Sequence, residues 1–156
     1  MKTNHPKNWP NDLLYVSTMN YKKIDIPKKS SIDGVRIVVL GENHFLHGQY
    51  GLIATKNFSK FNILGEYTGK INKTGNKFSA FLTEIYNVDA STSGNEMRFI
   101  NDYRNIADRP NVCLEVCYID KKPKILIVVI EKINEGNEIL LDYGESYFNY
   151  YIKTKM

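Results

Sequence analysis

The chain has 156 residues, of which 42% are hydrophobic and 24% charged, and its formal net charge is +4. These values predict a single folded domain with a real core and exclude a largely disordered chain. No apolar run approaches the roughly 20 residues that a membrane-spanning helix needs. Residues 1–10 also lack the apolar centre of a signal peptide, so we expect an intracellular protein without membrane contact.

The charged and sulfur-containing residues favour neither nucleic-acid binding nor metal binding. The lysines occur in short pairs, at residues 22–23, 28–29 and 121–122, whereas nucleic-acid readers usually cluster basic residues with stacking aromatics. Cys113 and Cys117 would face one side of a strand about 14 Å apart, too far for a disulfide. No histidine lies in ligand spacing with them, so we interpret both as buried free thiols and predict no metal site.

The N-terminal part of the chain, residues 1–31, is predicted to be a polar, flexible or loosely docked extension, from which Trp9, Leu13, Leu14 and Tyr15 could pack against the domain. A strand bounded by glycines follows at Gly34–Gly41. The next strand is predicted to start from a glycine-containing segment, Gly48-Gln-Tyr-Gly-Leu-Ile-Ala-Thr55.

The middle of the chain is predicted to form short strands around one helical turn. Ile63–Gly69 is strand-like, and Lys77–Ile85 alternates apolar and polar residues as a half-buried strand does. The segment Tyr86-Asn-Val-Asp-Ala90 follows, and Gly94–Asn101 has room for a single helical turn.

The C-terminal part contains the clearest strand signals. Val112–Ile119 is predicted to be a strand, Asp120–Pro123 a turn, and Lys124–Ile130 a continuous apolar strand of the kind that lies in the centre of a sheet. Glu145–Lys155 has the pattern of a short amphipathic helix. Periodicity alone therefore predicts a mostly β domain of short strands with little helix.

Two segments, in this order, carry a family resemblance: Arg98-Phe-Ile-Asn101 and Glu138-Ile-Leu-Leu-Asp-Tyr-Gly144. They resemble the two closing motifs of SET-domain protein-lysine methyltransferases, and Gly48–Ala54 and Gly65–Gly69 resemble two earlier motifs. The resemblance implies a SET domain at residues 32–148, followed by an aromatic and basic tail at 149–156. It also implies small, mainly antiparallel sheets and a C-terminal pseudoknot, in which the Asn101 segment surrounds the strand before Tyr143.

The resemblance implies methyl transfer from S-adenosylmethionine to a lysine amine of a protein substrate. Tyr143 is then the catalytic residue, because a phenol places an uncharged, electron-rich oxygen on a rigid ring beside the polarised methyl group. Tyr67 would orient the amine and form a channel wall. An apolar channel would lower the lysine pKa by desolvation, so no separate base is needed. Taken alone, either tyrosine could be an ordinary core aromatic.

The resemblance also assigns the cofactor contacts. Asn101 and Arg98 are expected at the amino-acid end of S-adenosylmethionine, where a planar guanidinium suits a carboxylate. The family usually has Gly where this chain has Gln49, and His where it has Asp102. A His donates hydrogen bonds, whereas an ionised Asp only accepts them. The other expected cofactor contacts are Gly48, Gln49, Tyr50, Asp102 and Tyr143.

The lysine channel is expected to be lined by Tyr67, Leu114, Leu141, Tyr147 and Phe148. No cysteine-rich zinc segment follows Gly144, although many family members use one to complete the channel, so the aromatic residues after Gly144 are the available substitute. Leu114 and Leu141 match positions that help to set the number of methyl groups added. Leucine has no hydroxyl to hold a water beside the amine, so we expect di- or trimethylation, unless both leucines are simply core residues.

Two functions stay open from the sequence. One is an active lysine methyltransferase. The other is a catalytically silent SET-like domain that binds a protein, which would be favoured by Asp102, by Gln49 and by the insertion of about four residues, relative to the family pattern, between Asn101 and Pro110-Asn111. For the enzyme, the resemblance suggests a histone tail as substrate and a nuclear or chromatin location. A basic tail would need a local acidic groove, for which Glu66, Asp89 and Glu96 are candidates. The sequence specifies neither the target lysine nor the oligomeric state.

Overall fold

The β-strands of this protein are short and pair into small sheets. The computed structural model describes residues 5–16, 32–76 and 78–147. Within these residues a 3₁₀ helix, η1, spans Glu96–Phe99, and residues 145–147 are helical. The predicted mostly β architecture with little helix is confirmed. The strands in chain order are β1 (Leu14–Tyr15), β2 (Val35–Val39), β3 (Tyr50–Ala54), β4 (Ile63–Glu66), β5 (Lys70–Asn72), β6 (Ser79–Phe81), β7 (Asn87–Asp89), β8 (Ser93–Gly94), β9 (Asn101–Asp102), β10 (Val112–Ile119), β11 (Lys122–Val129) and β12 (Leu140–Leu141).

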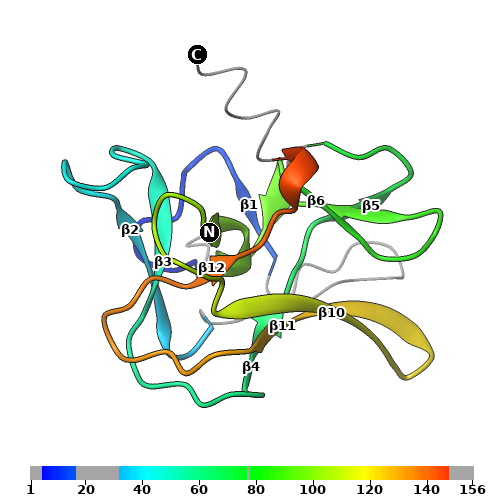
Figure 1. Cartoon of the computed structure of the whole chain (residues 1–156). Helices are drawn as coiled ribbons and strands as arrows, with labels where there is room; N and C mark the ends of the chain where they lie inside the picture. The colour runs from blue at the N-terminus through cyan, green and yellow to red at the C-terminus, as the bar shows by residue number, and fades with distance from the viewer. Residues whose placement is uncertain (1–4, 17–31, 77, 148–156) are drawn as a thin grey trace.

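Antiparallel sheets form the body of the domain (Figure 1). β2 pairs with β3 in a hairpin, a second sheet has the order β10-β11-β4, and a third has the order β5-β7-β6. Two short pairs are parallel, β1 with β8 and β9 with β12. In the view of Figure 1 the β2–β3 hairpin and the β5-β7-β6 sheet lie on opposite sides, and β12 runs between them.

The β10–β11 hairpin follows the sequence pattern closely. β10 has the predicted bounds, and β11 starts two residues before the predicted Lys124. Asp120 and Lys121 form the turn, and both have positive φ, at 51° and 62°. Three alternate side chains of β11 face the core and are at most 1% exposed: Ile125, Ile127 and Val129. As the central strand of its sheet, β11 can bury such a run without leaving its backbone groups unpaired.

The strand predicted at Lys77–Ile85 is much shorter in the structure, where only Ser79–Phe81 form β6. It ends early because the backbone N–H groups of Leu82 and Thr83 both donate to the carbonyl of Tyr86, which closes a turn. The alternation that prompted the prediction is real over this stretch, since Ala80 and Leu82 are buried and Phe81 is exposed. The helical turn predicted within Gly94–Asn101 is present as η1.

The described N-terminal residues, 5–16, pack into the core of the domain. Trp9 is only 5% exposed, and its ring meets those of Tyr15 and Phe99 edge-on at 5.1 and 5.5 Å. The hydroxyl of Tyr15 donates to the buried carboxylate of Glu96, which also accepts from the backbone N–H of Ile32 at 2.8 Å. This segment therefore helps to fix the start of η1, and with it the residues that follow η1.

The predicted pseudoknot is formed by residues 101–111 and β12. β9 pairs with β12 in parallel, with Asn101 opposite Leu140. The chain then loops away and returns at Asn111, whose backbone N–H donates to the carbonyl of Leu140 at 3.0 Å. The Asn111 side chain accepts from the backbone N–H of Leu140 and donates to the carbonyl of Glu138, both at 2.8 Å. β12 is therefore held on two sides by one segment.

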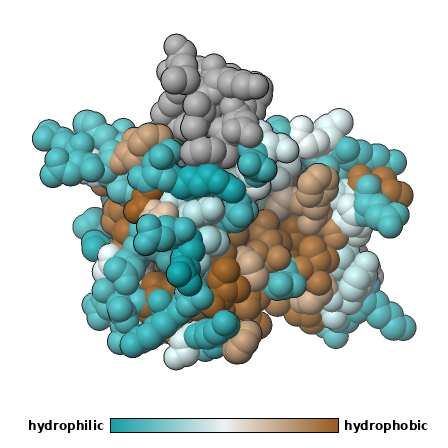
Figure 2. Space-filling model, viewed as in Figure 1, coloured by the Kyte–Doolittle hydropathy of each residue, from teal (hydrophilic) through white to brown (hydrophobic). Residues whose placement is uncertain are grey.

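Apolar side chains remain on the surface of one part of the molecule. Figure 2 shows them between β6 and the β10–β11 hairpin. Phe81 on β6 and Val116 and Ile119 on β10 are among the exposed apolar residues of the described chain. The projecting loops in the same view are largely hydrophilic. Among the described residues, no helix has the length and apolar character needed to cross a membrane.

Candidate active site

Two pockets meet at a shared wall of aromatic side chains. The larger, pocket A, has a volume of about 310 Å³ and lies among β3, η1, β9 and the loop at residues 41–49. Pocket B has a volume of about 190 Å³ and is lined by parts of β6, β10, β11 and β12. Phe78, Tyr143 and Tyr147 line both pockets. A ligand in pocket A therefore lies across these three side chains from a ligand in pocket B.

Tyr143 follows β12, and hydrogen bonds fix both its backbone and its hydroxyl group. Its backbone N–H donates to Oδ2 of Asp102 at 2.8 Å, and its hydroxyl donates to the carbonyl of Ile100. Its ring packs edge-on against that of Tyr147, with centroids 4.9 Å apart. Burial, with smaller effects from nearby Tyr67 and Tyr147, raises the pKa of Tyr143 well above its ordinary value. The phenol is therefore neutral at physiological pH.

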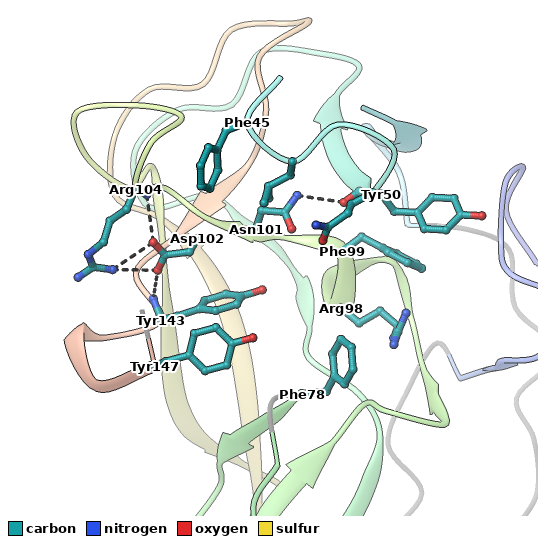
Figure 3. Close-up of a pocket in the computed structure, with 12 residues that line it drawn as sticks. Phe45, Tyr50, Phe78, Arg98, Phe99, Asn101, Asp102, Arg104, Tyr143 and Tyr147 are labelled. Atoms are coloured by element: carbon teal, nitrogen blue, oxygen red, sulfur yellow. Dashed lines mark hydrogen bonds and ion pairs between the residues drawn. The ribbon is translucent and has the colours of Figure 1, made fainter. Parts of the chain in front are cut away.

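The hydroxyl of Tyr143 can act only as an acceptor toward the pockets. A hydroxyl has one proton and two lone pairs, and the proton is already committed to Ile100. Figure 3 shows the phenol oxygens of Tyr143 and Tyr147 pointing to the same side, toward Phe78 and Arg98. The shared wall thus presents a neutral acceptor oxygen on a fixed ring.

Tyr67 lines pocket B and is arranged in a similar way. Its hydroxyl donates to the carbonyl of Phe78 at 2.8 Å, so its lone pairs are left to accept. Burial raises the pKa of Tyr67 well above its ordinary value, against the opposing effect of the nearby Arg98. Pocket B therefore contains two neutral tyrosines as acceptors, and its other walls include Leu114 and Leu141.

Asn101 presents a hydrogen-bond acceptor to pocket A. Its side-chain nitrogen donates to the carbonyl of Tyr50 and to Oε1 of Glu138, both at 3.0 Å. A carbonyl and a carboxylate can only accept, which fixes the orientation of the amide. Both N–H groups are used in these bonds, so Oδ1 is the atom left for a ligand. The first of these bonds is drawn in Figure 3.

Arg98 supplies a cation to the lining of pocket A. Its Nε donates to the carbonyl of Ala90 at 2.8 Å, and its guanidinium lies over the rings of Phe78 and Phe99, 4.8 Å from each centroid. Burial lowers the pKa of Arg98, but a guanidinium keeps its charge in proteins. Within the described part of the chain, no group accepts a hydrogen bond from its terminal nitrogens. Arg98 can therefore bind a carboxylate while Asn101 accepts from an ammonium group.

Asp102 braces the site rather than opening toward a ligand. Its carboxylate accepts from the backbone N–H of Arg104 at 3.0 Å, from Nη1 of Arg104 at 2.9 Å and from the backbone N–H of Tyr143. Nη1 of Arg104 also contacts Oδ1 of Asp142 at 2.8 Å. These bonds use the acceptor-only character that distinguishes Asp from the His usual at this position. They connect the loop after β9 to the residues on both sides of Tyr143.

The other sequence-predicted site residues are distributed over both pockets. Gln49 and Tyr50 line pocket A, Leu114 and Leu141 line pocket B, and Tyr147 lines both. Gly48 is not among the lining residues. It has a φ of +78°, and its N–H donates to the carbonyl of Leu40 where the β2–β3 loop closes. Phe148 lies outside the described residues.

Several lining residues were missed from the sequence. Phe45 and Leu46 lie in the β2–β3 loop and line pocket A, and Phe45 is 53% exposed. An adjacent pair of apolar residues in an otherwise polar loop was the available signal. Arg104 also lines pocket A. Its position two residues after Asp102 was the only local sign in the sequence that it could belong to the site. Phe78 and Phe99 had no distinguishing signal beyond their apolar character.

Glu96, one of the three candidates for an acidic groove, does not contribute to such a groove. Glu96 is 1% exposed and holds Tyr15 and Ile32. Glu66 is also committed, because its Oε2 accepts from Nζ of Lys124 at 2.8 Å.

Cys113 and Cys117 carry free thiols, as predicted, but both are half-buried rather than buried. β10 is an edge strand, so its side chains are covered less completely than those of the central β11. Over residues 5–16, 32–76 and 78–147, no group of three or more His, Cys, Asp or Glu is placed to hold a metal ion.

Comparison with known proteins identifies the family of this arrangement. The family model described as "SET domain" matches residues 49–144. Histone-lysine N-methyltransferase EZH2 of Chaetomium thermophilum is 26% identical over 134 residues, which cover 73% of this chain and 8% of that protein. Human histone-lysine N-methyltransferase 2D is 26% identical over 156 residues, covering 91% of this chain and 3% of that protein. The chain thus spans a small fraction of these relatives.

Solved structures show the same fold. A humanized mutant of the Chaetomium thermophilum polycomb repressive complex 2, bound to the inhibitor GSK126, has a TM-score of 0.58 and 25% identity, and the match covers 70% of this chain and 15% of that one. The ctPRC2 structure "in an autoinhibited conformation bound to S-adenosylmethionine" has a TM-score of 0.61 at 21% identity, with 82% and 17% covered.

Proposed function

Because this chain belongs to the SET-domain family of protein-lysine methyltransferases, we propose that it transfers methyl groups from S-adenosylmethionine to lysine side chains of a protein. The observation that carries this proposal is the wall shared by the two pockets, with the phenol oxygen of Tyr143 in it. Transfer between two substrates requires that their reacting atoms meet, and ligands in the two pockets would meet at this wall.

Pocket A fits the methyl donor. Its volume of about 310 Å³ lies in the range of small-molecule sites. Asn101 Oδ1 would accept from the ammonium group of the amino-acid end, and Arg98 would bind the carboxylate. When bound, S-adenosylmethionine supplies a methyl group on a positively charged sulfur. The aromatic residues Phe45 and Phe99 would cover apolar parts of the ligand.

Pocket B fits a lysine side chain. Leu114, Leu141 and Ile127 give it apolar walls, along which the methylene groups of lysine would pack. Burial in such surroundings lowers a lysine pKa, so the amine loses its proton before transfer and no dedicated base is required. The lone pairs of Tyr67 accept from an amine N–H and thereby orient the nitrogen.

Tyr143 would align the reacting groups at the shared wall. Its oxygen, fixed by the bond to Ile100, can accept weak C–H contacts from the polarised methyl group. Holding nitrogen, carbon and sulfur in line removes several kcal/mol of the barrier by positioning alone. A neutral phenol also stabilises positive charge without becoming a nucleophile, and burial keeps Tyr143 neutral.

The substrate and the product are proposed more specifically. The relatives at 26% identity are named histone-lysine methyltransferases, which supports a histone tail as substrate and a nuclear location. Leu114 and Leu141 both line pocket B and provide no hydroxyl to hold a water beside the amine. The amine can then turn and accept further methyl groups, so we expect di- or trimethyl-lysine.

Purified protein tests the proposal directly. Incubation with S-adenosylmethionine and histone peptides should add about 14 Da to a lysine for each methyl group transferred. Mass spectrometry of the peptides measures this increase. Calorimetry should show binding of S-adenosylhomocysteine, the demethylated product. A folded protein that binds histone peptide but neither form of the cofactor would instead identify a catalytically silent binding module.

A further inference from the structure

Glu138 is a mostly buried carboxylate that contacts Asn101, a lining residue of pocket A, without lining the pocket itself. Its side chain is 10% exposed. Its backbone is fixed by a bridge to Ile53 in β3 and by the bond from the Asn111 side chain to its carbonyl at 2.8 Å. Glu138 therefore has a defined position, and its two oxygens have fixed directions.

Each carboxylate oxygen has one side-chain partner, of which Asn101 lines pocket A and His44 directly precedes the lining residue Phe45. Oε1 accepts from Nδ2 of Asn101 at 3.0 Å, and Oε2 lies 2.9 Å from Nε2 of His44. Nδ1 of His44 accepts from the backbone N–H of Leu46 at 3.0 Å. With Nδ1 an acceptor, a neutral His44 carries its proton on Nε2 and donates it to Glu138. The carboxylate is thus the common acceptor for two donors from opposite sides.

The space for this carboxylate is provided by Gly51. A Cβ atom at position 51 would lie 2.9 Å from Oε1 of Glu138 and 2.8 Å from Cδ2 of Leu40. Any side chain there would displace the carboxylate, the leucine or both. The glycine in β3, the acid at residue 138 and the amide of Asn101 therefore form one arrangement.

We propose that Glu138 is a positioning residue that holds the Asn101 amide with Oδ1 toward pocket A, so that the site favours ligands carrying an ammonium group at this point. The inference rests on the proposed function of pocket A. A carboxylate can only accept, so it excludes the flipped amide, in which Oδ1 would face Glu138 and the carbonyl of Tyr50. The flipped amide would present N–H donors to the ligand and repel an ammonium group.

Glu138→Gln tests this role, because glutamine keeps the size of the side chain but has one acceptor and two donor hydrogens. It cannot satisfy both Asn101 and His44. We expect the Kd of S-adenosylhomocysteine, measured by calorimetry, to rise about tenfold or more, as for a mispaired buried polar group. The Kd of 5′-methylthioadenosine, which lacks the amino-acid end, should stay within about twofold. Glu135→Gln makes the same substitution at an exposed position nearby and should leave both values unchanged.

The comparison of the two ligands separates positioning from a general structural effect. An equal loss for both ligands, or no loss for either, would overturn the role of Glu138. If Glu138→Gln fails to fold, Gly51→Ala displaces the carboxylate while keeping its charge, and the same difference between ligands is expected. Wild-type protein that binds neither ligand would refute the proposed function itself, which is a distinct result.

Discussion

Replacing Tyr143 by phenylalanine removes one oxygen from the wall shared by the two pockets and leaves the ring in place. The ring keeps its edge-on contact with Tyr147 at 4.9 Å and continues to line both pockets. The backbone bond from Tyr143 to Asp102 is also kept. The substitution therefore isolates what the hydroxyl contributes.

The structure sets separate magnitudes for stability, binding and rate. The lost bond leaves the Ile100 carbonyl without its hydroxyl donor, which should reduce the free energy of unfolding by about 1–2 kcal/mol. Cofactor affinity should change by less than about twofold, because the ring surface is unchanged. The rate should fall by about 100-fold, or ~3 kcal/mol, as when one preorganised polar group is removed from a transition state.

The assay is the initial rate of peptide methylation by mass spectrometry, with thermal unfolding and calorimetry of S-adenosylhomocysteine on the same preparations. Tyr118→Phe is the matched control, because Tyr118 lies on β10 and is 70% exposed; its rate should equal that of the wild type. A folded Tyr143→Phe protein with wild-type activity would show that this oxygen does not serve the reaction.

Three further predictions concern the same site. Leu141→Tyr adds a hydroxyl to pocket B and should shift an exhaustive reaction toward monomethyl-lysine, counted by mass spectrometry; unchanged product would mean that Leu141 is only a core residue. Asp102→Asn leaves a single side-chain oxygen to accept from Arg104 and from the Tyr143 N–H, so kcat in steady-state assays should fall about tenfold. Asp102→His introduces the residue usual in the family but should not restore kcat. Because burial raises the pKa of Tyr143, the phenol stays neutral where free tyrosine ionises, near pH ~10. Initial rates should therefore show no loss through ionisation of this phenol up to that pH, and a fall in rate below pH ~9 would contradict this.

Features of the fold that depend on local periodicity could be predicted from the sequence. β10 has its predicted bounds, and the apolar run of β11 lies at the centre of a sheet. The ends of β6 could not be predicted, because they are set by hydrogen bonds to Tyr86 across a turn. Alternation reports which face is buried, whereas the end of a strand depends on where its backbone groups find partners.

The candidate site likewise contains residues that could be predicted from the sequence and contacts that could not. The motif residues Tyr143, Asn101 and Tyr67 come together around the two pockets, as the order of the motifs led us to expect. The bond between His44 and Glu138 connects residues far apart in the sequence, and nothing local marks His44 as its partner. Arg104 likewise acquires its role only after the chain has folded back to Asp142. Such contacts depend on topology, which single-residue patterns do not encode.

The way residues 101–111 hold β12 on two sides has a consequence for the rates of folding and unfolding. Both contacts join segments distant in sequence, and non-local contacts of this kind slow folding. Withdrawal of β12 breaks the β9 pair and the Asn111 bonds together, so local opening at Tyr143 should require nearly global unfolding. We therefore expect amide hydrogens at Leu140 and Tyr143 to exchange as slowly as those of the core strand β11. Tyr143, which follows β12, would then keep one conformation because of the path of the chain around that strand.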